Sequence, residues 1–121
     1  MSYEFYKVIH LMGLVLVMTA LGGMSFHVAN GGTRVYPSKK LVSMAHGIGL
    51  LIMLIGGFGL LARLGMVRGL PAWAIAKIGI WIVIGALPAF IYRKPQFARL
   101  FWALIVVLGT TAAWLAILKP F

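Results

Sequence analysis

Four long apolar segments dominate this sequence of 121 residues and constrain its fold more than any other feature. Each segment is roughly 20 residues long, close to the length of an α-helix that crosses a bilayer at about 1.5 Å per residue. Hydrophobic residues make up 63% of the chain and charged residues only 10%. A soluble domain of this size has too little interior to bury so much apolar surface. The sequence therefore predicts an integral membrane protein.

Turn-forming residues separate the apolar segments and set the expected helix ends. Asn-Gly-Gly at residues 30–32 is typical of a helix end, whereas Ser38 is a suitable N-cap and Pro71 and Pro95 suit first turns. Connections this short make neighbouring helices antiparallel. We therefore expect an all-α, antiparallel up-down-up-down four-transmembrane-helix bundle. It forms a single membrane domain over residues 1–121, with helices over about 3–29, 38–64, 71–92 and 95–119.

Basic side chains are distributed unequally between the two ends of the predicted bundle. The first and third loops carry Arg34, Lys39, Lys40, Arg93, Lys94 and Arg99, and the opposite end carries Lys7, Arg63, Arg68 and Lys119. By the positive-inside rule, the first and third loops face the cytoplasm. We therefore expect a multi-pass protein of the cell inner membrane with periplasmic termini. No nucleic-acid partner is expected, because the cations lie in short loops rather than along one exposed face.

Several kinds of chemistry are excluded by composition. The chain has no cysteine, which excludes disulfides, thiolate metal sites and iron–sulfur clusters. Its one acidic residue is Glu4, so paired-carboxylate catalysis and carboxylate cages for calcium or magnesium have no residues to use. The polar side chains within the apolar segments are the remaining functional candidates.

Small residues predict which helices pack closely, since they let backbones approach in lipid. The first two predicted helices are the richest in such residues, so we expect them to pack along their length. Packing alone is sufficient to explain these glycines. The residues are Gly13, Ala20 and Gly23 in the first helix, and Ala45, Gly49, Gly56 and Gly57 in the second.

A candidate polar layer follows from comparing depths along the predicted helices. We compare depths by counting residues from each connecting turn along the two helices that it joins. This count places His10 and Lys77 within about 3 Å of one another in depth. It places Thr111, with Thr110 beside it, at the same level in the fourth helix. A histidine titrates near neutrality, so such a pair could exchange protons or ligate a metal. The alternative is structural: Lys77 reaches the membrane interface, and His10 bonds a helix backbone.

The other two histidines lie at different predicted depths. His27 is level with the cytoplasmic edge, and His46 lies roughly 10 Å deeper by the helical rise. A b-type haem with two histidine ligands needs both at nearly one depth, which no pair among these histidines meets. Haem would therefore require a His/Lys or His/Met pair, a single ligand, or one histidine from each of two copies. His46 is expected near Arg93 and Arg99, which could receive haem propionates or anionic lipid.

Short motifs resemble a loose group of small bacterial membrane proteins. They are Lys7-Val-Ile-His10 with Gly13 and Gly22-Gly23, His46-Gly47, and the spacing of Trp73 and Lys77. The group comprises the SirB family, the CopD-like domains and the HemJ-type protoporphyrinogen oxidases. In the HemJ-type enzymes, a histidine of the first helix and a lysine of the third are important for function, and the protein is thought to hold b-type haem. The resemblance implies these roles for His10 and Lys77.

Two functions of different classes follow. In the first, the chain is a small membrane redox protein that binds haem b or a porphyrin, a HemJ-like oxidoreductase. His10 and Lys77 are then the catalytic pair, His10 is the metal ligand, and His46, Thr111 and Arg93 also contact the cofactor. In the second, it is a non-catalytic accessory subunit that packs against a larger membrane complex. Either function places it in a lipid bilayer, as a homo-oligomer or as a subunit of a larger assembly.

Overall fold

The computed structural model describes residues 2–120, and every regular element in that range is helical. Four helices in it are long and apolar enough to cross a membrane, which confirms the all-α prediction with four such segments. The elements are α1 (Tyr3–Ala29), α2 (Lys39–Arg63), α3 (Ala72–Arg93), the short 3₁₀ helix η1 (Pro95–Phe97) and α4 (Ala98–Leu118).

The helix ends follow the turn residues of the sequence, with two differences. Gly31 adopts the left-handed backbone conformation, at φ +88°, directly after α1. Ser38 is the N-cap residue of α2, as predicted, but its side chain makes no capping hydrogen bond. The fourth helix begins as a 3₁₀ turn at Pro95 and becomes α-helical only at Ala98.

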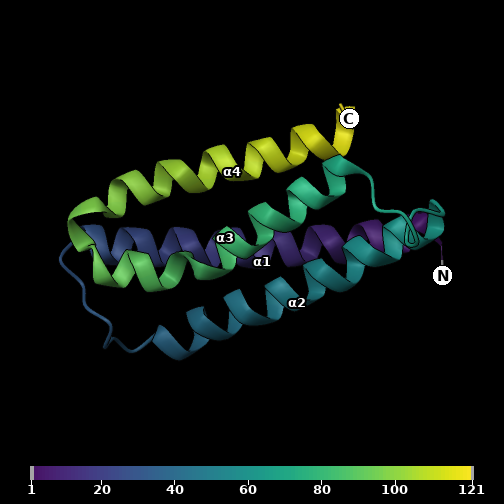
Figure 1. The fold of residues 1–121 in the computed structure, drawn as a ribbon. Coiled ribbons are helices and arrows are strands. Elements are labelled where there is room, and N and C mark those ends of the chain that lie inside the picture. Colours follow the sequence, from purple (N-terminus) through teal and green to yellow (C-terminus); the bar gives the residue numbers. More distant parts are fainter. Residues whose placement is uncertain (1, 121) are drawn as a thin grey trace.

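The helix α1 occupies the centre of the arrangement (Figure 1). It contacts the three other long helices, and its contact with α2 is the most extensive in the molecule. Within residues 2–120, no Cα atom of α2 lies within 8 Å of one in α4, and α2 approaches α3 at only a few positions. Both ends of the chain lie toward the same end of the structure (Figure 1).

Glycines bring α1 and α2 into backbone contact. A Cβ atom on Gly13 would lie 2.7 Å from the carbonyl oxygen of Gly49, and one on Gly56 would lie 2.7 Å from the backbone nitrogen of His10. No side chain fits at such separations, so the predicted close packing of these helices is confirmed. Gly23 differs, because a Cβ there would meet nothing within 4 Å.

The buried side chains form two apolar clusters. The larger one joins one face of α1 to α3 and α4, with Val17, Leu21, Met24, Ile84 and Ile105 among its members. The smaller one lies where α2 and α4 end and α3 begins, and contains Leu61, Trp73, Ala74 and Leu115.

Candidate functional site

A cavity of about 560 Å³, partly open to the surroundings, is lined by side chains from all four long helices. Sites for small molecules and cofactors typically measure about 300–1,000 Å³ and are mostly apolar with a few polar groups. This cavity follows that pattern, because aliphatic and aromatic side chains make up most of its lining. The charged or titratable side chains among the lining residues are Tyr3, Lys7, His10, Lys77 and Lys119.

His10 is fixed at one ring nitrogen and free at the other. Its Nδ1 lies 2.7 Å from the carbonyl oxygen of Met53. A carbonyl only accepts, so Nδ1 carries the proton and Nε2 of the neutral ring keeps a lone pair. Within residues 2–120, no hydrogen bond occupies Nε2. His10 therefore presents an imidazole nitrogen that can bind a proton or a metal.

The close approach of α2 gives the His10 ring its place. Gly56 lies against the backbone of His10, and a Cβ on Gly57 would lie 3.4 Å from the ring. A larger residue at Gly56 would separate the helices and move Nδ1 away from the Met53 carbonyl. The glycines of α2 thus set both the packing and the orientation of the imidazole.

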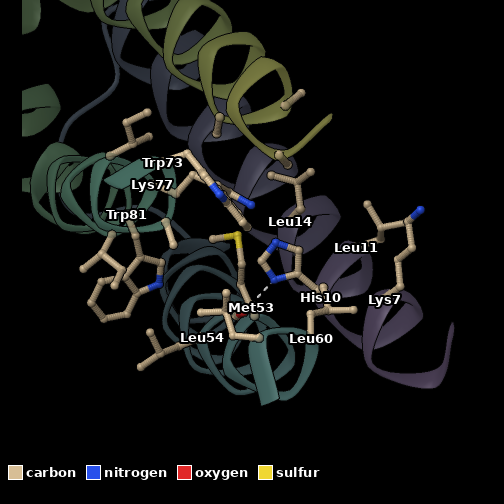
Figure 2. Close-up of a pocket in the computed structure, with 18 of the residues that line it drawn as sticks. Lys7, His10, Leu11, Leu14, Met53, Leu54, Leu60, Trp73, Lys77 and Trp81 are labelled. Carbon is tan, nitrogen blue, oxygen red and sulfur yellow. Dashed lines mark hydrogen bonds between the residues drawn. The ribbon is translucent and has the colours of Figure 1, made fainter. Parts of the chain in front are cut away.

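Lys77 of α3 lines the same cavity, as the depth comparison predicts. Figure 2 shows the side chains of Lys77, Trp73 and Met53 directed toward the His10 ring. Lys77 is half-buried, and its Nζ makes no hydrogen bond with any of residues 2–120. The sequence therefore identified two polar residues that tertiary structure brings into one cavity.

Thr111 does not complete the predicted polar layer. Its hydroxyl donates a hydrogen bond of 2.8 Å to the carbonyl oxygen of Val107 within α4, and it is not a lining residue. Thr110 is exposed. The helix α4 instead presents four small residues and one isoleucine to the cavity, namely Gly109, Ala112, Ala113, Ala116 and Ile117.

Met53 is a cavity residue that the sequence reasoning did not name. Its side chain is 7% exposed and lines the cavity, so a thioether sulfur lies on the side where His10 is anchored. Its spacing in the sequence could have indicated this position. Met53 follows Gly49 by one helical turn, so it lies on the face of α2 that packs on α1. The sequence allows a His/Met pair of haem ligands but does not indicate which methionine.

Two tryptophans of α3 form part of the cavity wall. The indole nitrogen of Trp81 donates a hydrogen bond of 3.1 Å to the carbonyl oxygen of Leu50 in α2. The ammonium group of Lys119 lies 5.2 Å from the centre of the Trp73 ring, within cation–π range. These contacts hold both rings in place beside the His10 cavity.

His46 lies outside the cavity and has a different partner. Its Nε2 is 3.1 Å from the carbonyl oxygen of Ile84, and the side chain is 7% exposed. In an uninterrupted helix, that carbonyl would accept from the N–H of residue 88, but Pro88 has none. His46 therefore supplies the donor that α3 lacks, and Arg93, exposed at the end of α3, lines no part of the cavity.

His27 belongs to an aromatic cluster beside the first loop. Its ring stacks on Tyr36 at 3.8 Å between centres, and its Nε2 bonds the carbonyl oxygen of Thr33 at 2.8 Å. The hydroxyls of Tyr36 and Tyr92 are 2.6 Å apart, and Lys39 lies over the Tyr92 ring. This cluster fastens the loop to α3, and none of its members lines the cavity.

Metal-binding side chains are sparse in the part of the chain that the structure describes. No group of three or more His, Cys, Asp or Glu side chains in residues 2–120 is arranged to hold a metal ion. At the cavity, His10 is the one imidazole among the lining residues.

These features define an all-helical protein with four helices of membrane-spanning length and an apolar cavity among them. No protein-family model matches the chain, and comparisons with curated proteins and with solved structures give no significant match. The cavity and the residues that line it are therefore the features of this protein that point to a function.

Proposed function

We propose that this chain is a multi-pass protein of the cell inner membrane, with its helices in an antiparallel up-down-up-down bundle and both termini periplasmic. Four apolar helices with short connections support this, as does the position of both chain ends at one end of the fold (Figure 1). The excess of basic residues in the first and third loops supports the orientation. Lipid then covers the apolar side chains that α2 and α4 expose.

We further propose that the cavity holds b-type haem or a related porphyrin and that the protein is a membrane oxidoreductase. The observation that carries this proposal is His10, whose Nδ1–H is held by the Met53 carbonyl while Nε2 is unbonded at an apolar cavity. Metal-binding histidines commonly donate their second N–H to a backbone carbonyl, which fixes the ring and makes the other nitrogen more basic. The resemblance of His10 and Lys77 to the important pair of the HemJ-type enzymes points the same way.

The residues of the cavity fit this group. The imidazole of His10 would hold the haem iron, because histidine is a common ligand of haem. The thioether of Met53 or the amine of Lys77, which line the same cavity, could supply a further ligand. Bound haem supplies one-electron chemistry. Lys77, when it is not a ligand, can hold a proton close to His10.

Spectroscopy of the purified protein tests this proposal. In mild detergent, the protein should show a Soret band that sharpens on reduction. The band should be lost in His10→Ala, with circular dichroism showing retained helix, and kept in His27→Ala. A colourless protein that fails to take up added haem and copurifies with larger membrane proteins would favour the accessory-subunit function instead.

A further inference from the structure

We propose that the cavity binds an amphipathic anion, whose acidic group is held by Lys77 and Lys119 and whose apolar body lies along Trp73 and Trp81. This inference deepens the proposed function by naming the chemical class of the ligand. It rests on the same cavity but does not require iron or ligation by His10.

The first support is the sign of the charges around the cavity. Lys77 comes from α3 and Lys119 directly follows α4, and both line the cavity, with the Lys119 ammonium group over the Trp73 ring. Lys7 of α1 is also a lining residue, but its ammonium group points away from the His10 ring (Figure 2). Glu4, the one acidic side chain of the sequence, is not among the lining residues within 2–120. No carboxylate side chain is therefore available in the cavity wall to balance the lysines.

The second support is the energetic cost of placing lysine side chains close together with no carboxylate side chain beside them. Like charges repel more strongly beside apolar walls than in water, because the effective dielectric constant is lower. A cleft with charges of one sign also concentrates the opposite ion. Lys77 lies within electrostatic range of Lys119. A bound carboxylate or phosphate would offset this repulsion and give Lys77 a hydrogen-bond partner.

The third support is the way the ammonium groups are held. Lys119 donates a hydrogen bond of 2.9 Å to the carbonyl oxygen of Ala116 and lies over Trp73. Its charge is thus fixed above an aromatic wall of the cavity. Trp73 precedes Lys77 by one helical turn, so a ligand that packs on Trp73 lies within reach of both lysines.

The remaining lining determines the rest of the ligand. The wall from α4 is glycine and alanine with one isoleucine, Ile117, whereas α2 and α3 supply leucine, isoleucine, phenylalanine and tryptophan. An apolar body fits this lining, and a fully polar anion does not. The ligand class is therefore a membrane-soluble molecule with an acidic end. A carboxylic-acid cofactor and an anionic lipid share that chemistry.

The test uses metal-free protoporphyrin IX, a dicarboxylic acid, and its uncharged dimethyl ester. Binding to the full chain in phosphatidylcholine nanodiscs is measured by quenching of tryptophan fluorescence. We expect the acid to bind at least about tenfold more tightly than the ester, because charged hydrogen bonds to the lysines are lost with the ester. The double variant Lys77→Gln/Lys119→Gln should lose most of this preference, and Lys40→Gln/Lys94→Gln, outside the cavity, should keep it.

A second measurement identifies the source of the anion. If phosphatidylglycerol in the nanodisc displaces the acid from the parent protein, an anionic lipid occupies the site, whereas undiminished binding identifies a carboxylic acid.

Equal affinity for acid and ester, binding of neither, or equal losses in the two double variants would overturn the proposal. Because the probe lacks iron, its preference should persist in His10→Ala. If the protein prefers the acid but gives no haem Soret band, the proposal of haem binding is overturned and the proposal of an anion site is supported.

Discussion

The ring nitrogen Nε2 of His46 lies 3.1 Å from the carbonyl oxygen of Ile84. Pro88, four residues after Ile84, cannot supply the N–H that this carbonyl would accept in an uninterrupted helix. In a membrane-spanning segment, a free backbone carbonyl is costly, because no water replaces the missing donor. The histidine of α2 therefore compensates for the proline of α3, at a place where the two helices touch over only a small area.

A double-mutant cycle should reveal this compensation. His46→Ala should lower the stability of the protein by roughly 1–3 kcal/mol, since it leaves the Ile84 carbonyl buried without a donor. In a Pro88→Ala background, the restored N–H of residue 88 can bond that carbonyl, so the same change should cost less. Unfolding in mixed detergent micelles measures all four proteins. Equal costs of His46→Ala in both backgrounds would show that the histidine contributes by packing alone.

The paired action of His10 and Lys77 should appear as non-additivity. Lys77→Met should reduce pigment or activity without unfolding the protein, because methionine keeps an apolar stem of similar length but removes the amine. The double variant with His10→Ala should be little worse than His10→Ala alone, since residues that act as one unit are not additive. Haem content and turnover are the measurements. If both single variants keep full pigment and His46→Ala loses it, the site lies elsewhere.

Two glycines of α2 form a matched pair for testing the contact with α1. A Cβ on Gly49 would lie 2.8 Å from a methyl of Val17, whereas one on Gly47 would meet nothing within 4 Å. Gly49→Ala should therefore destabilise the protein by about 1–3 kcal/mol through overpacking. Gly47→Ala should be neutral or stabilising by up to about 1 kcal/mol, because alanine favours helix. Similar thermal stability of the two variants in detergent would contradict the close contact.

Reporter fusions test the proposed orientation. A C-terminal alkaline phosphatase fusion, which is active only in the periplasm, should be active. A fluorescent protein that matures only in the cytoplasm should be dark at the same position. The physical basis is the larger number of basic side chains in the first and third loops, which the positive-inside rule keeps in the cytoplasm. The opposite pattern of reporter activity would invert the bundle.

The local sequence determined where the helices begin and end. It also determined the depth at which most of their polar residues lie. An apolar segment of about 20 residues followed by Asn-Gly-Gly predicts where α1 ends, because helix length and the left-handed turn at Gly31 depend on neighbouring residues. The shared level of His10 and Lys77 followed from the constant helical rise alone. Both results come from distances along a helix axis, which residue counting provides.

Tertiary structure decided what each polar side chain faces. Rotation about a helix axis and the choice of neighbouring helix depend on how all four helices pack, and counting residues gives neither. Thr111 thus has a predicted depth near His10 but bonds its own helix, and His46 meets a carbonyl that Pro88 leaves free. Lys119 was assigned by sequence to a membrane edge, and packing brings it to the cavity of Lys77. Helix formation is governed by local contacts, whereas a cavity requires contacts between residues far apart in the chain.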